Sequence, residues 1–233
     1  MNNSDQKLWE YYQNENAAVF SSTHDRHNRV ARNVYKFVRN TSAQILEIGF
    51  GDGYLLKKLS KSYNCFGADL SSDVVEKMSR EVLAVDFKTI GVDGIMPYEN
   101  NFFDGFIASE VLEHMSDSEL TQSIKEMGRI LKKGAYAFIT FPADENLKEN
   151  ECFCPNCGAN FHRWGHKQSW NKKKIMEKFS DFETIQVGEY FVRFEGSNLF
   201  ERVFGYIFYI ARNIVNIFKK LPNRSYSVIL RKK

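Results

Sequence analysis

The sequence predicts an α/β fold built on a mostly parallel sheet, and three observations support this prediction. Short apolar runs typical of buried strands recur over residues 45–48, 64–70, 105–109 and 135–141. Between the last two runs lies 118–131, where apolar residues recur at helical spacing. A glycine-rich turn joins the first run to a further helix. Strand and helix therefore alternate, as expected of a parallel sheet covered by helices.

The glycine-rich turn consists of Gly49, Gly51 and Gly53. Glycine has no Cβ, so a ligand can approach such a backbone closely. A strand, a glycine loop and a helix in this order bind nucleotides at the carboxyl edge of a parallel sheet. Asp69 ends the next apolar run some twenty residues later, where an acid can accept hydrogen bonds from ribose hydroxyls.

Composition limits the class of protein. A chain of 233 residues with 43% hydrophobic content can bury one substantial core, so a single domain with an appendage is expected. The net charge of +3 does not indicate nucleic acid as a partner. No apolar stretch is long enough to span a bilayer, and the polar start of the chain lacks the apolar run of a signal peptide. The cytoplasm is therefore the expected compartment.

The remaining chain divides around the predicted core. Residues 8–40 are predicted to be helical and carry basic residues such as Arg26 and Arg29, which fit a solvated face, a cap over the cofactor or an anion site. A third strand is expected over 87–92, and Lys132–Gly134 is expected to close the helix before the fifth strand. The predicted parts of the single domain are a helical cap (1–40), a cofactor-binding core (41–142), an insertion (143–170) and C-terminal strands with a hydrophobic helix (171–233, helix 199–221).

Together these motifs resemble class I S-adenosylmethionine-dependent methyltransferases of the type-11/23 group. The matching pieces, in the family's order and spacing, are Glu47–Gly53, Asp69, Asp93, Met96–Asp104, Glu110–His114 and Arg129–Gly134. The resemblance implies a Rossmann-like, seven-stranded, mostly parallel sheet with helices on both faces. The third glycine follows the second by two residues instead of three, which argues against a nicotinamide dinucleotide.

The resemblance also implies the cofactor-binding residues. Glu47 and the glycine loop would hold the methionine moiety, Asp69 the ribose, and Asp93 with Gly94 the adenine edge. The full predicted set is Glu47, Gly49, Gly51, Gly53, Asp69, Leu70, Asp93, Gly94, Ser109 and Glu110.

A Glu-x-x-Glu-His string, Glu110–His114, follows the fourth strand, where the acceptor should lie beside the sulfonium. It resembles the metal-binding motif of ubiquinone-pathway O-methyltransferases and of small-RNA 3′-terminal ribose methyltransferases, in which His166 matches a later histidine. The predicted catalytic residues are therefore Glu110, Glu113, His114 and His166. Either these residues hold a divalent cation, or His114 or His166 acts as general base.

Three of the four cysteines crowd into residues 152–157, which in a reducing compartment suggests a metal. A Cys-x-x-Cys pair followed by two histidines fits tetrahedral zinc. The expected ligands are Cys154, Cys157 and His162, completed by His166 or by Cys152. Such a site would be structural and would order one wall of the substrate pocket.

The predicted C-terminal helix carries a long apolar stripe, and residues 201–233 hold eight Lys or Arg against one acid. The helix fits a lid over the pocket, a homodimer face, or a contact with the inner face of an anionic membrane.

The expected activity is methyl transfer to a hydroxyl of a small or lipid-linked metabolite, such as a sugar of a surface-polysaccharide pathway. The cofactors would be S-adenosylmethionine, zinc and a second divalent cation at Glu110, Glu113 and His114. Two alternatives are an RNA methyltransferase that grips a backbone with the zinc knuckle and basic tail, and a non-catalytic zinc-bearing interaction module.

Overall fold

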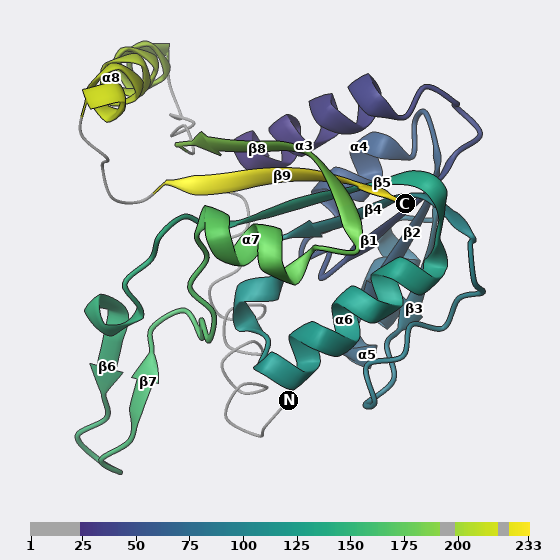
Figure 1. The fold of residues 1–233 in the computed structure, drawn as a ribbon, viewed down its shortest axis with the longest axis horizontal. Coiled ribbons are helices and arrows are strands. Elements are labelled where there is room, and N and C mark those ends of the chain that lie inside the picture. Colours follow the sequence, from purple (N-terminus) through teal and green to yellow (C-terminus); the bar gives the residue numbers. More distant parts are fainter. Residues whose placement is uncertain (1–23, 192–198, 219–223) are drawn as a thin grey trace.

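The computed structural model describes residues 24–191, 199–218 and 224–233. The predicted helix before residue 24 lies outside the described residues. The central feature is a seven-stranded sheet in the order β3-β2-β1-β4-β5-β9-β8, in which β9 runs antiparallel to both of its neighbours (Figure 1). The strands are β1 (Gln44–Ile48), β2 (Asn64–Asp69), β3 (Val85–Thr89), β4 (Phe103–Ser109), β5 (Leu131–Pro142), β8 (Phe182–Tyr190) and β9 (Ser225–Lys232). The predicted fold class is confirmed.

Helices cover both faces of the sheet. In β1, Ile45 points to one face and Leu46 to the other, and each belongs to a different buried cluster. The cluster with Leu46 is closed by α6 and α7, which lie in front of the sheet in Figure 1. The cluster with Ile45 is closed by α3, α4 and α5. The helices are α3 (His24–Phe37), α4 (Tyr54–Leu59), α5 (Ser72–Glu81), α6 (Asp117–Ile130), α7 (Lys172–Lys178) and α8 (Leu199–Phe218), with short 3-10 turns at Leu112–His114 and Leu147–Asn150.

The end of α6 differs from the prediction. Residues Lys132–Gly134 do not close the helix, because α6 ends at Ile130 and Leu131 already pairs with Phe103 of β4. The register of this pair shifts before Gly105, and Gly134 adopts a φ of 79° there. Gly134 therefore belongs to an irregular start of β5 and is not a helix cap.

The insertion after β5 forms a small unit of its own. Ala143 and Trp170 form an isolated parallel bridge, so the two ends of the insertion lie side by side. Trp170 is fully buried and stacks on Phe141 with ring centroids 4.3 Å apart. This contact anchors the base of the insertion to the sheet. Beyond the base, β6 (Glu151–Phe153) and β7 (Asn160–His162) pair as an antiparallel hairpin that projects from the domain (Figure 1).

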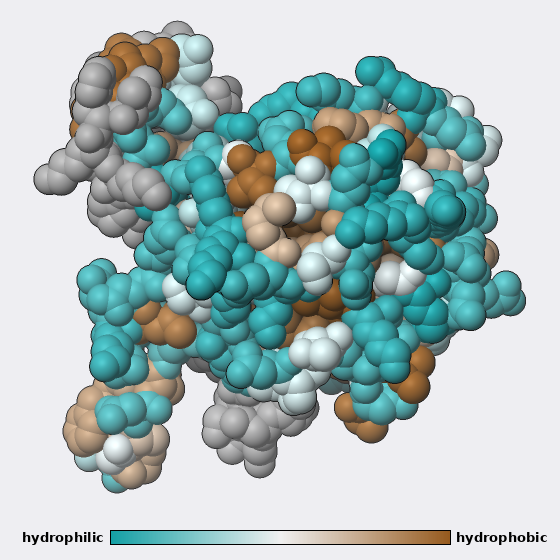
Figure 2. All heavy atoms as spheres, in the orientation of Figure 1, coloured by the Kyte–Doolittle hydropathy of each residue, from teal (hydrophilic) through white to brown (hydrophobic). Residues whose placement is uncertain are grey.

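The apolar stripe of α8 faces away from the rest of the protein. Figure 2 shows apolar side chains gathered over this helix. The exposed ones are Tyr206, Ile207, Phe208, Ile210, Ile214 and Val215. The opposite side contacts the domain, where the hydroxyl of Tyr209 accepts a hydrogen bond from Arg29 (3.2 Å) and Arg212 lies over the ring of Phe191. No helix in the described ranges is both long and apolar enough to cross a membrane.

Candidate active site

The glycine loop between β1 and α4 lies at the carboxyl edge of the sheet. Gly49, Gly51 and Gly53 all have positive φ values, of 61°, 54° and 68°. A Cβ on Gly49 would stand 2.6 Å from a methyl of Val111, in the segment that follows β4. Glycine is therefore required here both for the backbone conformation and for the close approach of the two loops.

Acidic side chains stand around this loop. Glu47 in β1 is 1% exposed, and its Oε2 atom has no hydrogen-bond partner. Burial raises the pKa of Glu47 well above its ordinary value. Asp69 ends β2 and accepts a hydrogen bond from the backbone N–H of Ser71 (2.9 Å), and burial raises its pKa also. The unpaired buried carboxyl group of Glu47 and the open glycine loop fit the amino group of S-adenosylmethionine. Asp69, at the end of the second strand, fits its ribose.

The other predicted cofactor residues lie at the same edge. Leu70 follows Asp69 directly and is half exposed. Asp93 is exposed and accepts a hydrogen bond from the N–H of Ile95 (3.0 Å), and Gly94 follows with a φ of 74°. Ser109 ends β4, where its hydroxyl lies 3.1 Å from that of Thr140. Their specific roles stay predictions.

Next to the cofactor loop, the structure brings together the four predicted catalytic residues. Glu110 has a φ of 56°, an unusual backbone conformation for glutamate that is typical of functional sites. Glu113 is fully buried, and neither of its carboxylate oxygens has a hydrogen-bond partner. Glu113, His114 and His166 each offer a potential metal-binding atom within 4.8 Å of the others. Burial lowers the pKa of His114 to about 3, so its imidazole is neutral at physiological pH.

The insertion carries His166 to this cluster. The backbone N–H groups of Lys167 and Gln168 donate to the carbonyl of Glu113 at 2.7 and 2.9 Å. The side chain of Gln168 donates to the carbonyl of Met115 (2.9 Å). These bonds hold the rings of His114 and His166 4.8 Å apart.

Helix α3 covers the site from the other side. His24 pairs with Asp52 of the glycine loop (3.1 Å) and stacks on Tyr54. Arg26 forms an ion pair with Glu110 (3.3 Å). These contacts place the start of α3 beside the glycine loop, and the role of its basic residues stays a prediction.

Tyr190, at the end of β8, also belongs to this region, and sequence reasoning missed it. It is buried, its hydroxyl has no hydrogen-bond partner, and the Arg29 guanidinium lies 4.4 Å from its ring centroid. Burial raises its pKa. A tyrosine at the end of an apolar strand gives no signal of its own, because the same pattern is typical of core residues.

The predicted zinc ligands separate into two groups. Cys154 and Cys157 lie in the turn between β6 and β7, where backbone N–H groups of Cys157 and Asn156 lower the pKa of the Cys154 thiol. His162 and His166 lie at the base of the hairpin, where they group with Glu145 within 4.8 Å. Within the described ranges, neither candidate metal group contains a cysteine, so a shared zinc site stays a prediction.

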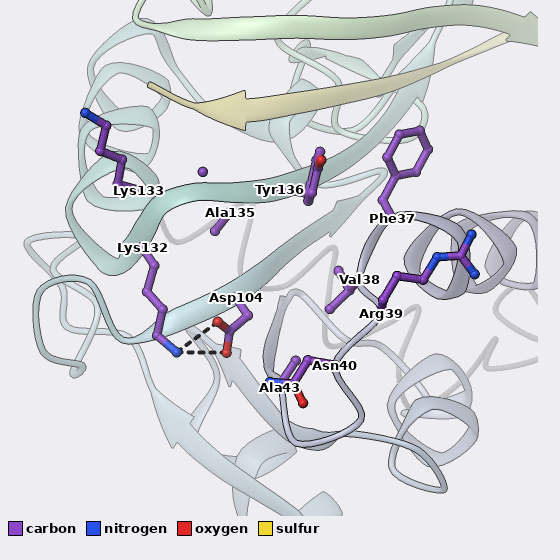
Figure 3. A pocket seen from close by; sticks show the side chains of 11 residues that line it. Phe37, Val38, Arg39, Asn40, Ala43, Asp104, Lys132, Lys133, Ala135 and Tyr136 are labelled. Atoms are coloured by element: carbon purple, nitrogen blue, oxygen red, sulfur yellow. Dashed lines mark hydrogen bonds and ion pairs between the residues drawn. The ribbon is translucent and has the colours of Figure 1, made fainter.

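A separate hollow of about 240 Å³ lies at the opposite edge of the sheet. Figure 3 shows the Lys132–Asp104 ion pair (2.9 Å) at its rim, near Ala43 and Tyr136. These residues lie at the starts of the strands, away from the glycine loop, so the hollow is not part of the site.

Comparisons with known proteins agree with this geometry. Residues 45–134 match the family model described as a methyltransferase domain. The uncharacterized methyltransferase YdaC of Bacillus subtilis (strain 168) is 29% identical over 128 residues, which cover 52% of this chain and 70% of YdaC.

Two solved structures share the fold. The N-methyltransferase NodS of Bradyrhizobium japonicum WM9, in complex with S-adenosylhomocysteine, has a TM-score of 0.66 at 14% identity over 99% of both chains. The 1,6-didemethyltoxoflavin-N1-methyltransferase of Burkholderia thailandensis, with 1,6-didemethyltoxoflavin and S-adenosylhomocysteine bound, has a TM-score of 0.66 at 11% identity, covering 97% of this chain and 85% of that one. The family match, the relative and the cofactor-loop geometry lead to one conclusion: this chain carries a methyltransferase domain at residues 45–134 and has the fold of S-adenosylmethionine-dependent methyltransferases.

Proposed function

We propose that this methyltransferase methylates a hydroxyl group, and that Glu113, His114 and His166 hold a divalent cation that polarises this hydroxyl. The observation that carries the proposal is the carboxylate of Glu113. It is fully buried, neither oxygen has a hydrogen-bond partner, and two imidazoles stand beside it. A buried carboxylate in this condition is costly unless a cation or a proton compensates it.

The hydrogen bonds of both histidines suit metal binding. Nδ1 of His114 lies 3.3 Å from the carbonyl oxygen of Gly165, and Nδ1 of His166 lies 2.6 Å from a carboxylate oxygen of Glu145. A carbonyl or carboxylate oxygen can only accept, so Nδ1 carries the proton in each ring. The lone pair of each neutral imidazole is then on Nε2, the nitrogen that a metal would bind.

The chemistry of the proposed metal ligands favours a hydroxyl group as the methyl acceptor. S-adenosylmethionine supplies a methyl group that its sulfonium already activates. The protein must align the acceptor and lower the cost of removing its proton, because a neutral hydroxyl is a weak nucleophile. Glu113 and the imidazoles suit a cation such as Mn²⁺, Co²⁺ or Zn²⁺, and Glu110 lies beside them at the cofactor edge.

Cobalt binding tests the metal proposal directly. We expect the purified full chain to bind Co²⁺ with the d–d absorption of nitrogen and oxygen ligands, and Glu113→Gln and His166→Gln to lose this absorption. Glu149→Gln, which removes an exposed carboxylate from the insertion, is the matched control and should retain it. Absence of Co²⁺ binding at roughly millimolar metal would overturn the proposal. If Co²⁺ binds only with thiolate charge-transfer bands that Cys154→Ser abolishes, the metal belongs to the cysteines instead.

We also propose zinc at Cys154 and Cys157 as a structural metal of the hairpin. The lowered pKa of Cys154 supports it, because the thiolate is the form that binds zinc. The test is the zinc content of the purified protein with Cys154→Ser as control. Less than roughly half an equivalent of zinc rejects the proposal.

We further propose that α8 lies on an anionic membrane surface, which favours a lipid-linked acceptor. Its exposed side consists of apolar side chains such as Ile207 and Ile214, and its half-buried side holds Arg212. Lys219 and Lys220 follow the helix directly in the sequence. A helix of this kind binds a bilayer interface through its apolar area and its cations.

Vesicle flotation tests this contact. The full chain should float with phosphatidylserine-containing vesicles and much less with neutral ones, and Ile207→Glu should abolish flotation. Leu83→Glu, which changes an apolar residue outside α8 that is more exposed than Ile207, is the control. Absence of flotation with both vesicle types would overturn the proposal, as would a dimer in ultracentrifugation that Ile207→Glu dissociates.

A further inference from the structure

A chain of polar contacts within the insertion ends at His166. The carboxylate of Glu145 accepts from Nδ1 of His166 (2.6 Å) through Oε2, and its Oε1 lies 3.4 Å from Nε2 of His162. All three side chains are shielded from solvent, with exposed fractions of 14% or less. None of these contacts involves the cysteines of the hairpin.

The environment of His162 fixes its tautomer. Its Nδ1 atom accepts hydrogen bonds from the backbone N–H groups of His166 (3.0 Å) and Trp164 (3.3 Å). A ring nitrogen that accepts carries no proton, so the proton of the neutral ring is on Nε2 and faces Glu145. In this tautomer the N–H edge of His162 faces the carboxylate at 3.4 Å without hydrogen-bond geometry, and Nε2 lacks the lone pair that a metal there would need.

Glu145 is held in place by its remaining contacts. Asn150 donates to its Oε1 atom (3.1 Å), and the hydroxyl of Ser169 donates to its backbone carbonyl (2.6 Å). These contacts, with the bond from His166, hold the side chain as an acceptor in one orientation.

We propose that Glu145 is a positioning residue for the metal site: it fixes His166 as the Nδ1–H tautomer, and His162 in turn orients Glu145. This inference rests on the proposed cation at Glu113, His114 and His166. A carboxylate behind a metal-binding histidine fixes the ring and raises its basicity, and its loss typically lowers metal affinity by about 10- to 100-fold. His162 then serves the same site indirectly and not the cysteine knuckle.

His162 and His166 also border a hollow in which an acceptor group could lie. A hollow of about 200 Å³ lies against the hairpin, with His162 and His166 in its wall. Its other lining residues are Leu147, Glu151, Asn160 and Phe161. An acceptor group entering this hollow would meet the ring that Glu145 orients.

The test combines metal affinity with a direct view of the tautomer. The full-length protein and Glu145→Gln are titrated with Mn²⁺ by calorimetry. The tautomer of each histidine is read without metal from long-range ¹H–¹⁵N spectra, which must resolve only five imidazoles. Glu145→Gln keeps the size of the side chain, and Glu149→Gln removes a neighbouring exposed carboxylate as the control. His162→Gln is a second, milder variant.

We expect Glu145→Gln to weaken Mn²⁺ binding by about 10- to 100-fold and to shift His166 away from the Nδ1–H tautomer, with Glu149→Gln unchanged in both. His162→Gln should weaken binding by less. If the unmodified protein binds Mn²⁺ and Glu145→Gln binds it equally well, the positioning role is overturned while the metal proposal stands. If the unmodified protein binds no divalent cation, the metal proposal fails and the positioning role fails with it.

Discussion

The Nδ1 atom of His114 lies 3.3 Å from the carbonyl oxygen of Gly165, although 51 residues separate them in the sequence. The loop after β4 supplies the imidazole, and the backbone of the insertion sets its orientation. The site beside the cofactor loop is therefore built by two segments together. Neither segment would place its own histidine without the other.

Replacing Asp69 by Ala should weaken binding of S-adenosylmethionine. The variant removes a carboxylate expected to accept hydrogen bonds from the ribose, each worth about 1.5–3 kcal/mol, so the dissociation constant should rise by roughly 10- to 100-fold. Isothermal titration of the purified protein measures this, with Asp73→Ala on the exposed surface of α5 as control. An unchanged affinity in Asp69→Ala would contradict the assigned role.

Replacing Gly49 by Ala should be more damaging than replacing Gly134 by Ala. Both glycines have positive φ, so either substitution should cost about 1–2 kcal/mol of stability through backbone strain. A Cβ on Gly134 meets nothing within 4 Å, whereas one on Gly49 would stand 2.6 Å from Val111 and must displace it. We expect a further loss of roughly 1–3 kcal/mol and weaker cofactor binding for Gly49→Ala alone. Equal effects of the two variants in chemical denaturation and titration would exclude this explanation.

The free energy of unfolding should decrease as the pH falls below 6.5, partly because of His27. Burial, followed by the charge of Arg26, lowers the pKa of His27 to about 4 from an ordinary value near 6.5. Between pH 6.5 and pH 4 the unfolded chain therefore binds a proton that the folded protein does not. The free energy of unfolding should decrease over this window by roughly 3 kcal/mol in total, and this contribution should be constant above pH 6.5 and below pH 4.

The comparison with His27→Gln isolates this contribution, because other titrating groups affect both proteins equally. The stability difference between the two proteins should change with pH only between 6.5 and 4. Urea denaturation at a series of pH values measures it. A difference that is constant across this range would show that His27 titrates normally.

Replacing Arg224 by Met should destabilise the base of the insertion. Its buried guanidinium pairs with Asp144 (3.0 Å) and with Glu189, so the variant removes a buried cation from two carboxylates and should cost about 3 kcal/mol, although Glu189 keeps Lys172 as a partner. Arg231→Met removes an exposed pair with Glu183 from β9, the strand that Arg224 precedes, and should leave the free energy of unfolding almost unchanged. If both variants unfold at the same denaturant concentration, burial of the Arg224 pair is not what stabilises this region.

The cofactor-binding half of the fold was predictable because its signals are local. Apolar runs such as Ile45–Ile48 and the glycines after them follow from short-range rules, and the carboxyl edge of a parallel sheet collects the acids that end the strands. The end of α6 was not predictable in the same way. Cations followed by a glycine also suit an irregular strand start, and only the pairing of Leu131 with Phe103 distinguishes the two.

The part of the site that contains the histidines depends on contacts between distant segments, which the spacing of residues in the sequence does not encode. The spacing of Cys154, Cys157 and His162 indicated one zinc site, which stays a prediction, and it gave no sign that Glu145 lies beside His162 and His166. Glu145 lies shortly after the end of β5 at the carboxyl edge of the sheet, and that position is the signal that could have found it. For α8, the periodicity of apolar residues predicted an apolar stripe. It did not predict whether this stripe faces the domain or solvent, because a helical wheel does not show which side of a helix contacts the rest of the protein.

The parallel bridge between Ala143 and Trp170 has a consequence for engineering. Because the intervening segment leaves the sheet and returns to it at adjacent points, exchanging it should leave donor binding intact. If this segment contacts the acceptor as we propose, transplanting residues 144–169 between proteins of this strand order should alter acceptor choice.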